Sequence, residues 1–203
     1  MEKLPGAAAL LLVDIQNDFC AGGALAVAEA DEIIPIVNRL IPKFRTIVAT
    51  QDWHPLNHSS FKEHGGPWPP HCVQHSRGAD LHPRLDTAGI TFRVRKGAVP
   101  ERDDYSEFEG VDDGGRKLDG LLKSRGVETV CVVGLATDYC VRATVLDALR
   151  NDYRVFVFED GIRAVNVAPG DGDRAIKEMA AAGAHIINSN AVLDEPRTSA
   201  ARR

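Results

Sequence analysis

Four residues with acid, base or nucleophilic side chains each follow a short apolar run in the sequence. In chain order they are Asp14, Asp52, Lys96 and Cys140. Apolar runs of this length are typical of buried strands, and the carboxyl ends of parallel strands meet at one edge of a sheet, where ligands bind. The sequence therefore predicts that two carboxylates, an amine and a thiol gather at one site.

Cys140 is the candidate nucleophile. The segment that begins at Gly134 leads from a predicted strand into a predicted helix, with Thr137 as the expected N-cap. A thiol in the first helical turn lies beside unpaired N–H groups and the positive end of the helix dipole, which stabilise a thiolate and could bind an oxyanion. The alternative is a buried structural cysteine, the usual state of a free thiol. We expect that state for Cys131, which lies within the strand.

Asp14 and Lys96 fit such a thiol. A carboxylate at a strand end can take the proton of the thiol, and the ammonium of Lys96 would favour both anions. Each residue also has a simpler interpretation. Asp14 could be a loop or capping residue, and Lys96 a solvated lysine in a basic run.

The residues that follow the second apolar run suit a divalent metal ion. Asp52 and His54 are two positions apart, so in an extended chain their side chains point to the same side, and His58 and His71 follow. Carboxylate and imidazole ligands suit Zn²⁺, Fe²⁺ or Mn²⁺. The alternative is a histidine-rich surface loop.

Strands and helices that would position these residues alternate along the chain. Strands are predicted at 8–14, 45–50, 91–94, 128–134, 153–158 and 184–187. Helices are predicted at 30–44, 116–125, 139–150 and 174–182. This alternation predicts a three-layer α/β fold, in which a six-stranded, mostly parallel sheet carries helices on both faces. Residues 52–88, rich in Pro, Gly and His, would form a metal-bearing loop region within a single domain spanning 1–203, with a frayed tail from Thr198.

Composition excludes several classes of function. The chain has 203 residues, of which 44% are hydrophobic, so it can bury a core. A net charge of −5 without a basic stripe argues against nucleic-acid binding, and no apolar run approaches the ~20 residues of a membrane span. Four cysteines without CxxC spacing, and no secretory signal, predict free thiols in the cytoplasm. Monomer and homo-oligomer both remain open.

Taken together, the motifs resemble those of the nicotinamidases (pyrazinamidases), which belong to the isochorismatase-like cysteine hydrolases. The resemblance extends from residue 13 to about residue 165 and so covers most of the chain. The matching segments, in the order of the family, are 13–20 with Gly22 and Gly23, 52–54 with His58, 68–72, 78–80, 96–97, 105–110 and 133–141.

The resemblance implies a role for individual residues. The implied catalytic triad is Asp14, Lys96 and Cys140. The implied metal ligands are Asp52, His54 and His71, with His58 as the fourth. The implied lining of the ring pocket is Phe19, Trp68 and Tyr105. In the family, the peptide bond that matches Leu135–Ala136 is cis, and the N–H groups that match Ala136 and Cys140 bind the oxyanion.

The expected reaction is hydrolysis of nicotinamide, and also of pyrazinamide, through a thioester on Cys140. One divalent ion, Zn²⁺ before Fe²⁺ or Mn²⁺, would orient the ring nitrogen, and the reaction would belong to NAD salvage. Three other functions fit the residues less well. Isochorismatases do not need Cys140, the metal-type residues argue against an N-carbamoyl amidase, and a binding module without turnover would lack a member of the triad.

Overall fold

A computed structural model describes residues 7–193. Within that range, six strands form one sheet in the order β3-β2-β1-β4-β5-β6, and all neighbouring strands are parallel. The strands are β1 (Ala8–Val13), β2 (Thr46–Asp52), β3 (Phe92–Lys96), β4 (Thr129–Leu135), β5 (Arg154–Arg163) and β6 (His185–Ile187). The predicted α/β class with its parallel sheet is confirmed.

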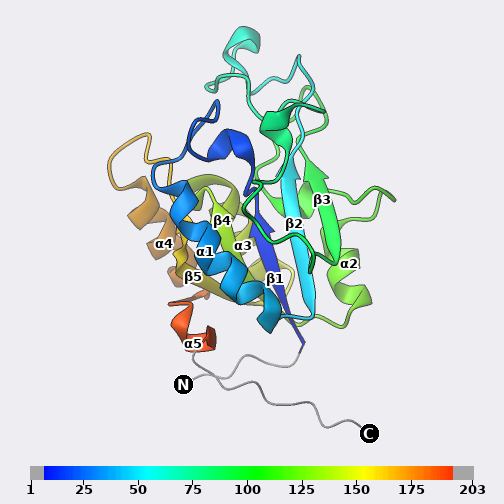
Figure 1. Cartoon of the computed structure of the whole chain (residues 1–203), viewed down its shortest axis with the longest axis vertical. Helices are drawn as coiled ribbons and strands as arrows, with labels where there is room; N and C mark the ends of the chain where they lie inside the picture. The colour runs from blue at the N-terminus through cyan, green and yellow to red at the C-terminus, as the bar shows by residue number, and fades with distance from the viewer. Residues whose placement is uncertain (1–6, 194–203) are drawn as a thin grey trace, which may run out of the picture.

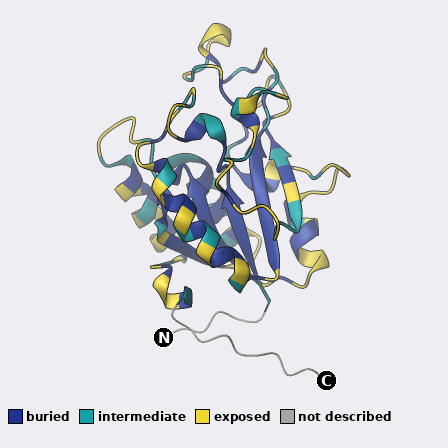
Figure 2. Cartoon of the chain, viewed as in Figure 1, coloured by how far each residue is buried: buried dark blue, intermediate teal, exposed yellow. Residues whose placement is uncertain are grey.

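Helices cover both faces of the sheet. They are α1 (Ile33–Leu40), α2 (Leu118–Ser124), α3 (Arg142–Arg150), α4 (Asp171–Ala181) and α5 (Asn190–Leu193). Successive side chains of a strand point to opposite faces. Leu10 and Leu12 therefore pack with α1 and α5, while Leu11 and Val13 pack with α2, α3 and α4. α1 crosses in front of the strands in Figure 1, and the central strands β1, β2 and β4 are almost wholly buried in Figure 2.

The observed strands differ from the predicted ones at their carboxyl ends. β2 and β3 continue to Asp52 and Lys96, so these are the last residues of strands and not the first residues of loops. β5 runs past its predicted end at residue 158, because its register against β4 shifts between Val132 and Gly134. A bulge of this kind lets a strand bend and keep pairing.

The predicted helix over residues 30–44 is divided into three pieces. The 3₁₀ turns Ala30–Glu32 and Ile41–Lys43 flank α1. Pro42 has no N–H to continue the helix, which explains the second break. No helix in the described part of the chain is long and apolar enough to cross a membrane. The predicted tail from Thr198 lies outside the described residues.

Residues 52–88 lie over the carboxyl ends of the strands, at the top of Figure 1. The side chain of Gln16, just after β1, fastens this region to the sheet. Its Nε2 donates to the carbonyls of Asp52 and Ala79, at 2.9 Å each, and its Oε1 accepts the Asp52 N–H at 2.8 Å. Short bridges such as that between Phe61 and Trp68 hold the loops together.

Gly134 allows β1 and β4 to approach closely where the order of the strands reverses. This switch point is the place where ligands bind in open parallel sheets. Gly134 has a φ of +122°, and a Cβ added there would lie 2.0 Å from the carbonyl oxygen of Val13. A side chain at this position would therefore push apart the two strands that lead to Asp14 and Cys140.

We expect Gly134→Ala to lower the free energy of unfolding by roughly 3 kcal/mol or more, because strain and overlap add. Gly120, on an exposed position of α2, has no atom within 4 Å of an added Cβ and serves as the matched control. Gly120→Ala should stabilise the protein by about 0.5–1 kcal/mol. Urea unfolding measures both, and equal stabilities would contradict the close approach.

Candidate active site

The ammonium of Lys96 lies at the centre of the polar cluster at the sheet edge. Its Nζ is 2.9 Å from Oδ2 of Asp14 and 3.5 Å from Sγ of Cys140, and it donates a hydrogen bond to Oδ1 of Asp52. Oε1 of Glu107 is 3.6 Å away. Burial alone would lower the pKa of Lys96, but Asp14 and Asp52 raise it well above its usual value. The three residues of the predicted triad are therefore in contact.

Asp14 is held by the neighbouring strand β2. It follows β1 with a left-handed φ of 46°. Its N–H donates to Oγ1 of Thr50 at 3.1 Å, and the Thr50 hydroxyl donates to its Oδ1 at 3.0 Å. Burial raises the pKa of Asp14, and Lys96 opposes that effect. A carboxyl group whose pKa is raised takes up a proton more readily than an ordinary aspartate.

Cys140 lies on a π-helical turn, Thr137–Val141, between β4 and α3. The turn follows a cis peptide bond between Leu135 and Ala136, and its N-cap is Ala136 in place of the predicted Thr137. The Ala136 carbonyl accepts the N–H groups of the residues on either side of Cys140, at 3.1 Å each. The Ala136 carbonyl accepts no hydrogen bond from the Cys140 N–H itself. Single π turns of this kind are frequent at functional sites.

The thiol of Cys140 is not activated at rest in the way its position near a helix start predicts. Its side chain is 5% exposed, and this burial raises its pKa well above the usual value. Lys96 lowers the pKa, but the carboxyl groups of Asp14, Asp52 and Glu107 raise it further. The resting group is therefore a neutral thiol, and a base has to remove its proton.

Asp52, His54 and His71 form a second cluster beside the first, with ligand atoms within 4.8 Å of one another. Nε2 of His54 and Nε2 of His71 lie 3.5 Å and 4.0 Å from Oδ2 of Asp52. Their Nδ1 atoms donate to the carbonyls of Gly97 and Pro69, at 3.0 Å and 2.8 Å. This tautomer leaves both Nε2 atoms free to bind a cation. The donor set fits a divalent transition metal.

His58 lies beside this cluster but makes other contacts. Its ring centroid is 4.1 Å from that of His54. Its Nε2 donates to the carbonyl of Arg102 at 3.0 Å, and its Nδ1 lies 2.7 Å from Oγ of Ser60. Both ring nitrogens are thus engaged, and the role of His58 as a fourth ligand stays a prediction.

Aromatic side chains stand around the two clusters. Nε1 of Trp68 donates to the Tyr105 hydroxyl at 3.2 Å, and the Trp68 ring meets Tyr139 edge-on at 5.1 Å. Phe19 packs against His71, with ring centroids 5.6 Å apart. Rings in this arrangement, with Trp68 and Tyr105 half-buried, suit a flat aromatic ligand.

A second group of metal-type residues lies beside an arginine. Cys20, Asp31 and His82 also lie together. However, Nη2 of Arg84 is 3.4 Å from Oδ2 of Asp31, and the Arg84 N–H donates to Nδ1 of His82 at 3.2 Å. The proton of His82 is then on Nε2, which faces Asp31 at 3.7 Å. Arg84 thus supplies a positive charge beside Asp31, while Oδ1 of Asp31 has no hydrogen-bond partner.

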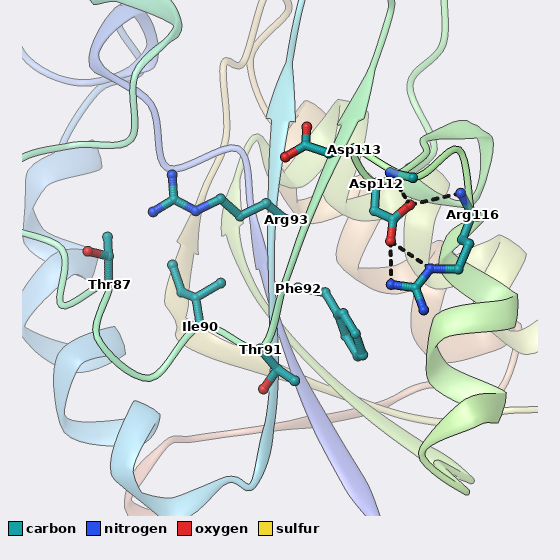
Figure 3. Close-up of a pocket in the computed structure, with 9 residues that line it drawn as sticks. Thr87, Ile90, Thr91, Phe92, Arg93, Asp112, Asp113 and Arg116 are labelled. Atoms are coloured by element: carbon teal, nitrogen blue, oxygen red, sulfur yellow. Dashed lines mark hydrogen bonds and ion pairs between the residues drawn. The ribbon is translucent and has the colours of Figure 1, made fainter.

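A surface hollow of about 610 Å³ lies beside the edge strand β3 (Figure 3). Thr87 and Arg93 line it on one side, and Phe92 with an ion pair between Arg116 and Asp112, at 2.7 Å, on the other. None of the predicted catalytic or metal-binding residues lines this hollow. The candidate catalytic residues lie outside this hollow, in the buried cluster around Lys96.

The sequence matches the isochorismatase domain over residues 8–191. The chain belongs to the isochorismatase family. It is 48% identical to the nicotinamidase of Escherichia coli (strain K12), over 88% of this chain and 93% of that protein.

Two solved structures of this family are similar over nearly the whole chain. One is PnC1 from L. infantum in complex with nicotinate, with a TM-score of 0.85 and 42% identity, covering 92% of this chain and 94% of that one. The other is the pyrazinamidase of Pyrococcus horikoshii in complex with zinc, with a TM-score of 0.81 and 45% identity, covering 91% and 99%.

Three residues near the site of this isochorismatase-family chain were not predicted from the sequence. Glu107 is fully buried beside Lys96, Thr50 fixes Asp14, and Asp138 anchors the turn that carries Cys140. The signal for Glu107 was weak. It lies in an aperiodic segment between two aromatic residues, where the sequence alone does not distinguish a buried acid from an exposed one.

Asp138 ties the nucleophile turn to the loop that follows β5. Its Oδ1 accepts the N–H of Val165 at 2.9 Å, and its Oδ2 accepts the N–H of Asn166 at 2.8 Å. Charged acceptors make strong hydrogen bonds to backbone N–H groups. The position of Cys140 in this family member therefore depends on a carboxylate two residues away.

We expect Asp138→Ala to lower the free energy of unfolding by about 1–3 kcal/mol, because two backbone donors lose their acceptor. The rate of Cys140 alkylation by iodoacetamide should change as well, since the turn loses its anchor. Asp113→Ala, at an exposed ion pair, is the control and should stay within about 0.5 kcal/mol. Unchanged unfolding and unchanged alkylation in Asp138→Ala would contradict the anchoring role.

Proposed function

We propose that this chain hydrolyses nicotinamide with Cys140 as the nucleophile and Asp14 as the proton carrier. The chain is an amidohydrolase that converts nicotinamide to nicotinate and ammonia, as its 48% identity to the E. coli nicotinamidase over most of both chains indicates. The observation that supports the residue roles is the buried ammonium of Lys96, which contacts both Asp14 and Cys140. Pyrazinamide, another flat ring carboxamide, is an expected second substrate.

In the first half of the reaction, the Asp14 carboxylate takes the proton of the Cys140 thiol. The thiolate attacks the carboxamide carbon, and the carbonyl oxygen becomes an oxyanion. The N–H groups of Ala136 and Cys140 are the proposed donors to this oxyanion. Asp14 then gives its proton to the departing nitrogen, the C–N bond breaks, and ammonia leaves a thioester on Cys140.

In the second half, Asp14 acts as a base again and takes a proton from water. The resulting hydroxide attacks the thioester carbon, the C–S bond breaks, and the sulfur of Cys140 recovers the proton from Asp14. Lys96 stays charged throughout and lies against both groups, so it stabilises whichever of them carries the negative charge.

We propose that Asp52, His54 and His71 hold one divalent ion, Zn²⁺ before Fe²⁺ or Mn²⁺. His58 would join as a fourth ligand once its Nε2 leaves the Arg102 carbonyl. A bound ion would supply a Lewis-acid position that orients the ring nitrogen of the substrate. The tautomers of His54 and His71 and the zinc complex of the P. horikoshii relative support this proposal.

We place the reaction in the cytoplasm. All four cysteines are free and buried, and buried free thiols of this kind suit a reducing compartment.

We expect Cys140→Ala to abolish ammonia release from nicotinamide and to leave metal content unchanged. Cys131→Ala is the matched control, because Cys131 lies within β4 and is fully buried. It should lose about 1 kcal/mol of stability through cavity formation and keep its activity. Ammonia release by Cys140→Ala at the rate of the wild type would refute the thioester route.

We expect His71→Ala to lose its divalent metal and most of its activity. Mass spectrometry on protein purified without a chelator measures the metal content. His64→Ala removes an exposed histidine of the same loop region and should keep both. His58→Ala should lose metal only in part if His58 is the fourth ligand.

The orienting role of the ion has a test in the substrate. Benzamide has the same carboxamide but no ring nitrogen, so its kcat/KM in the wild type should be far lower than that of nicotinamide. Equal turnover of benzamide would rule out orientation through the ring nitrogen.

A further inference from the structure

Glu107 is a buried acid that the proposed mechanism does not use. It begins the short 3₁₀ helix Glu107–Glu109, and its side chain is fully buried. Its N–H donates to Oγ1 of Thr144 at 3.1 Å, which ties it to α3, the helix that follows the Cys140 turn. Its Oε1 lies 3.6 Å from Nζ of Lys96. The fold therefore brings a third carboxyl group to the same ammonium.

The ammonium of Lys96 has too few protons for its neighbours. It carries three N–H donors, and it faces Asp14, Asp52, Cys140 and Glu107. Two of these donors are used in hydrogen bonds to Asp52 and Cys140. One donor therefore remains for two carboxyl groups, those of Asp14 at 2.9 Å and Glu107 at 3.6 Å.

Three buried oxygens of this cluster receive no well-directed hydrogen bond. They are Oδ2 of Asp14 and both carboxyl oxygens of Glu107. Lys96 forms an ion pair with Oδ2 of Asp14 at 2.9 Å, but without the alignment of a hydrogen bond. Buried carboxylates without donors are costly. A proton on Glu107 would remove the charge of one group and provide a donor for the other.

The charges around Lys96 also favour a protonated Glu107. Asp14, Asp52 and Glu107 would place three negative charges around one ammonium if all were ionised. Burial and the Asp14 carboxylate raise the pKa of Glu107 well above its usual value, against the opposing effect of Lys96. A carboxylic acid kept neutral by its surroundings can serve as a hydrogen-bond donor at neutral pH.

We propose that Glu107 is a positioning residue that acts as a neutral carboxylic acid and donates its O–H to Oδ2 of Asp14. Asp14 is then fixed by donors from two sides, Thr50 and Glu107, and stays an anion that can accept the proton of Cys140. Ionised Glu107 would lose this hydrogen bond and compete with Cys140 for Lys96. The inference rests on the proposed role of Asp14 as the base.

The test compares Glu107→Gln with Glu107→Ala in the metal-loaded, full-length enzyme. Glutamine keeps the shape and a donor, so it should restore most of the activity that Glu107→Ala loses. That loss should be roughly 10- to 100-fold in kcat, a part of what a general base contributes, with KM changed little. In the wild type, kcat should fall at high pH as Glu107 ionises, and Glu107→Gln should lack this fall. Glu109→Gln, at an exposed acid of the same short helix, is the control.

A second measurement does not depend on turnover. The infrared difference spectrum between the wild type and Glu107→Gln at pH 7 should contain the C=O stretch of a protonated carboxyl group. Absence of that band, or equal impairment of Glu107→Gln and Glu107→Ala, would overturn the inference. So would full activity of both variants. If the wild type released no ammonia from nicotinamide, the proposed function would fail, while the infrared band would still decide the state of Glu107.

Discussion

The buried ammonium of Lys96 is the charge on which the arrangement of the site depends. It has no access to water, so it is stable only beside Asp14 and Asp52, and their carboxylates remain buried only because it is present. The sheet brings the three groups together. Asp52 and Lys96 are register partners across β2 and β3, and Asp14 follows the next strand, β1. A change in strand register would therefore separate Lys96 from its carboxylates and leave buried charges without partners.

Asp52 connects the two halves of the site. Its Oδ1 accepts a hydrogen bond from Lys96, while its Oδ2 faces His54 and His71. Burial favours its neutral form, but Lys96 and His54 outweigh burial and hold the pKa of Asp52 well below its usual range. It is an anion at any working pH. A cation bound between His54 and His71 would thus affect Lys96 and its neighbours through the Asp52 carboxylate, which both groups share.

The residues that the sequence predicts best are those whose place follows from strand ends. Apolar runs locate Asp14 and Lys96, and alternation along an extended chain places Asp52 with His54. Glu107 cannot be predicted in this way, because its burial results from packing against segments distant in the sequence.

Local patterns fail in the same way for the state of the nucleophile. The start of a helix predicts a stabilised thiolate at Cys140, but burial by the whole fold outweighs that local effect. The π turn and the bulge beside Gly134 are also invisible to periodicity, since each departs from a regular period by a residue. Strand ends and helix spacing are local in sequence, whereas burial and bulges are set by distant contacts.

The neutral state of the Cys140 thiol makes it resistant to oxidation when no substrate is bound. Oxidants such as peroxides attack thiolates and leave neutral thiols almost untouched. A cysteine that is 5% exposed and whose pKa is raised by burial offers them little to react with. The other three cysteines are likewise free and buried. The same burial that keeps the Cys140 thiol neutral therefore protects it from sulfenic acid formation.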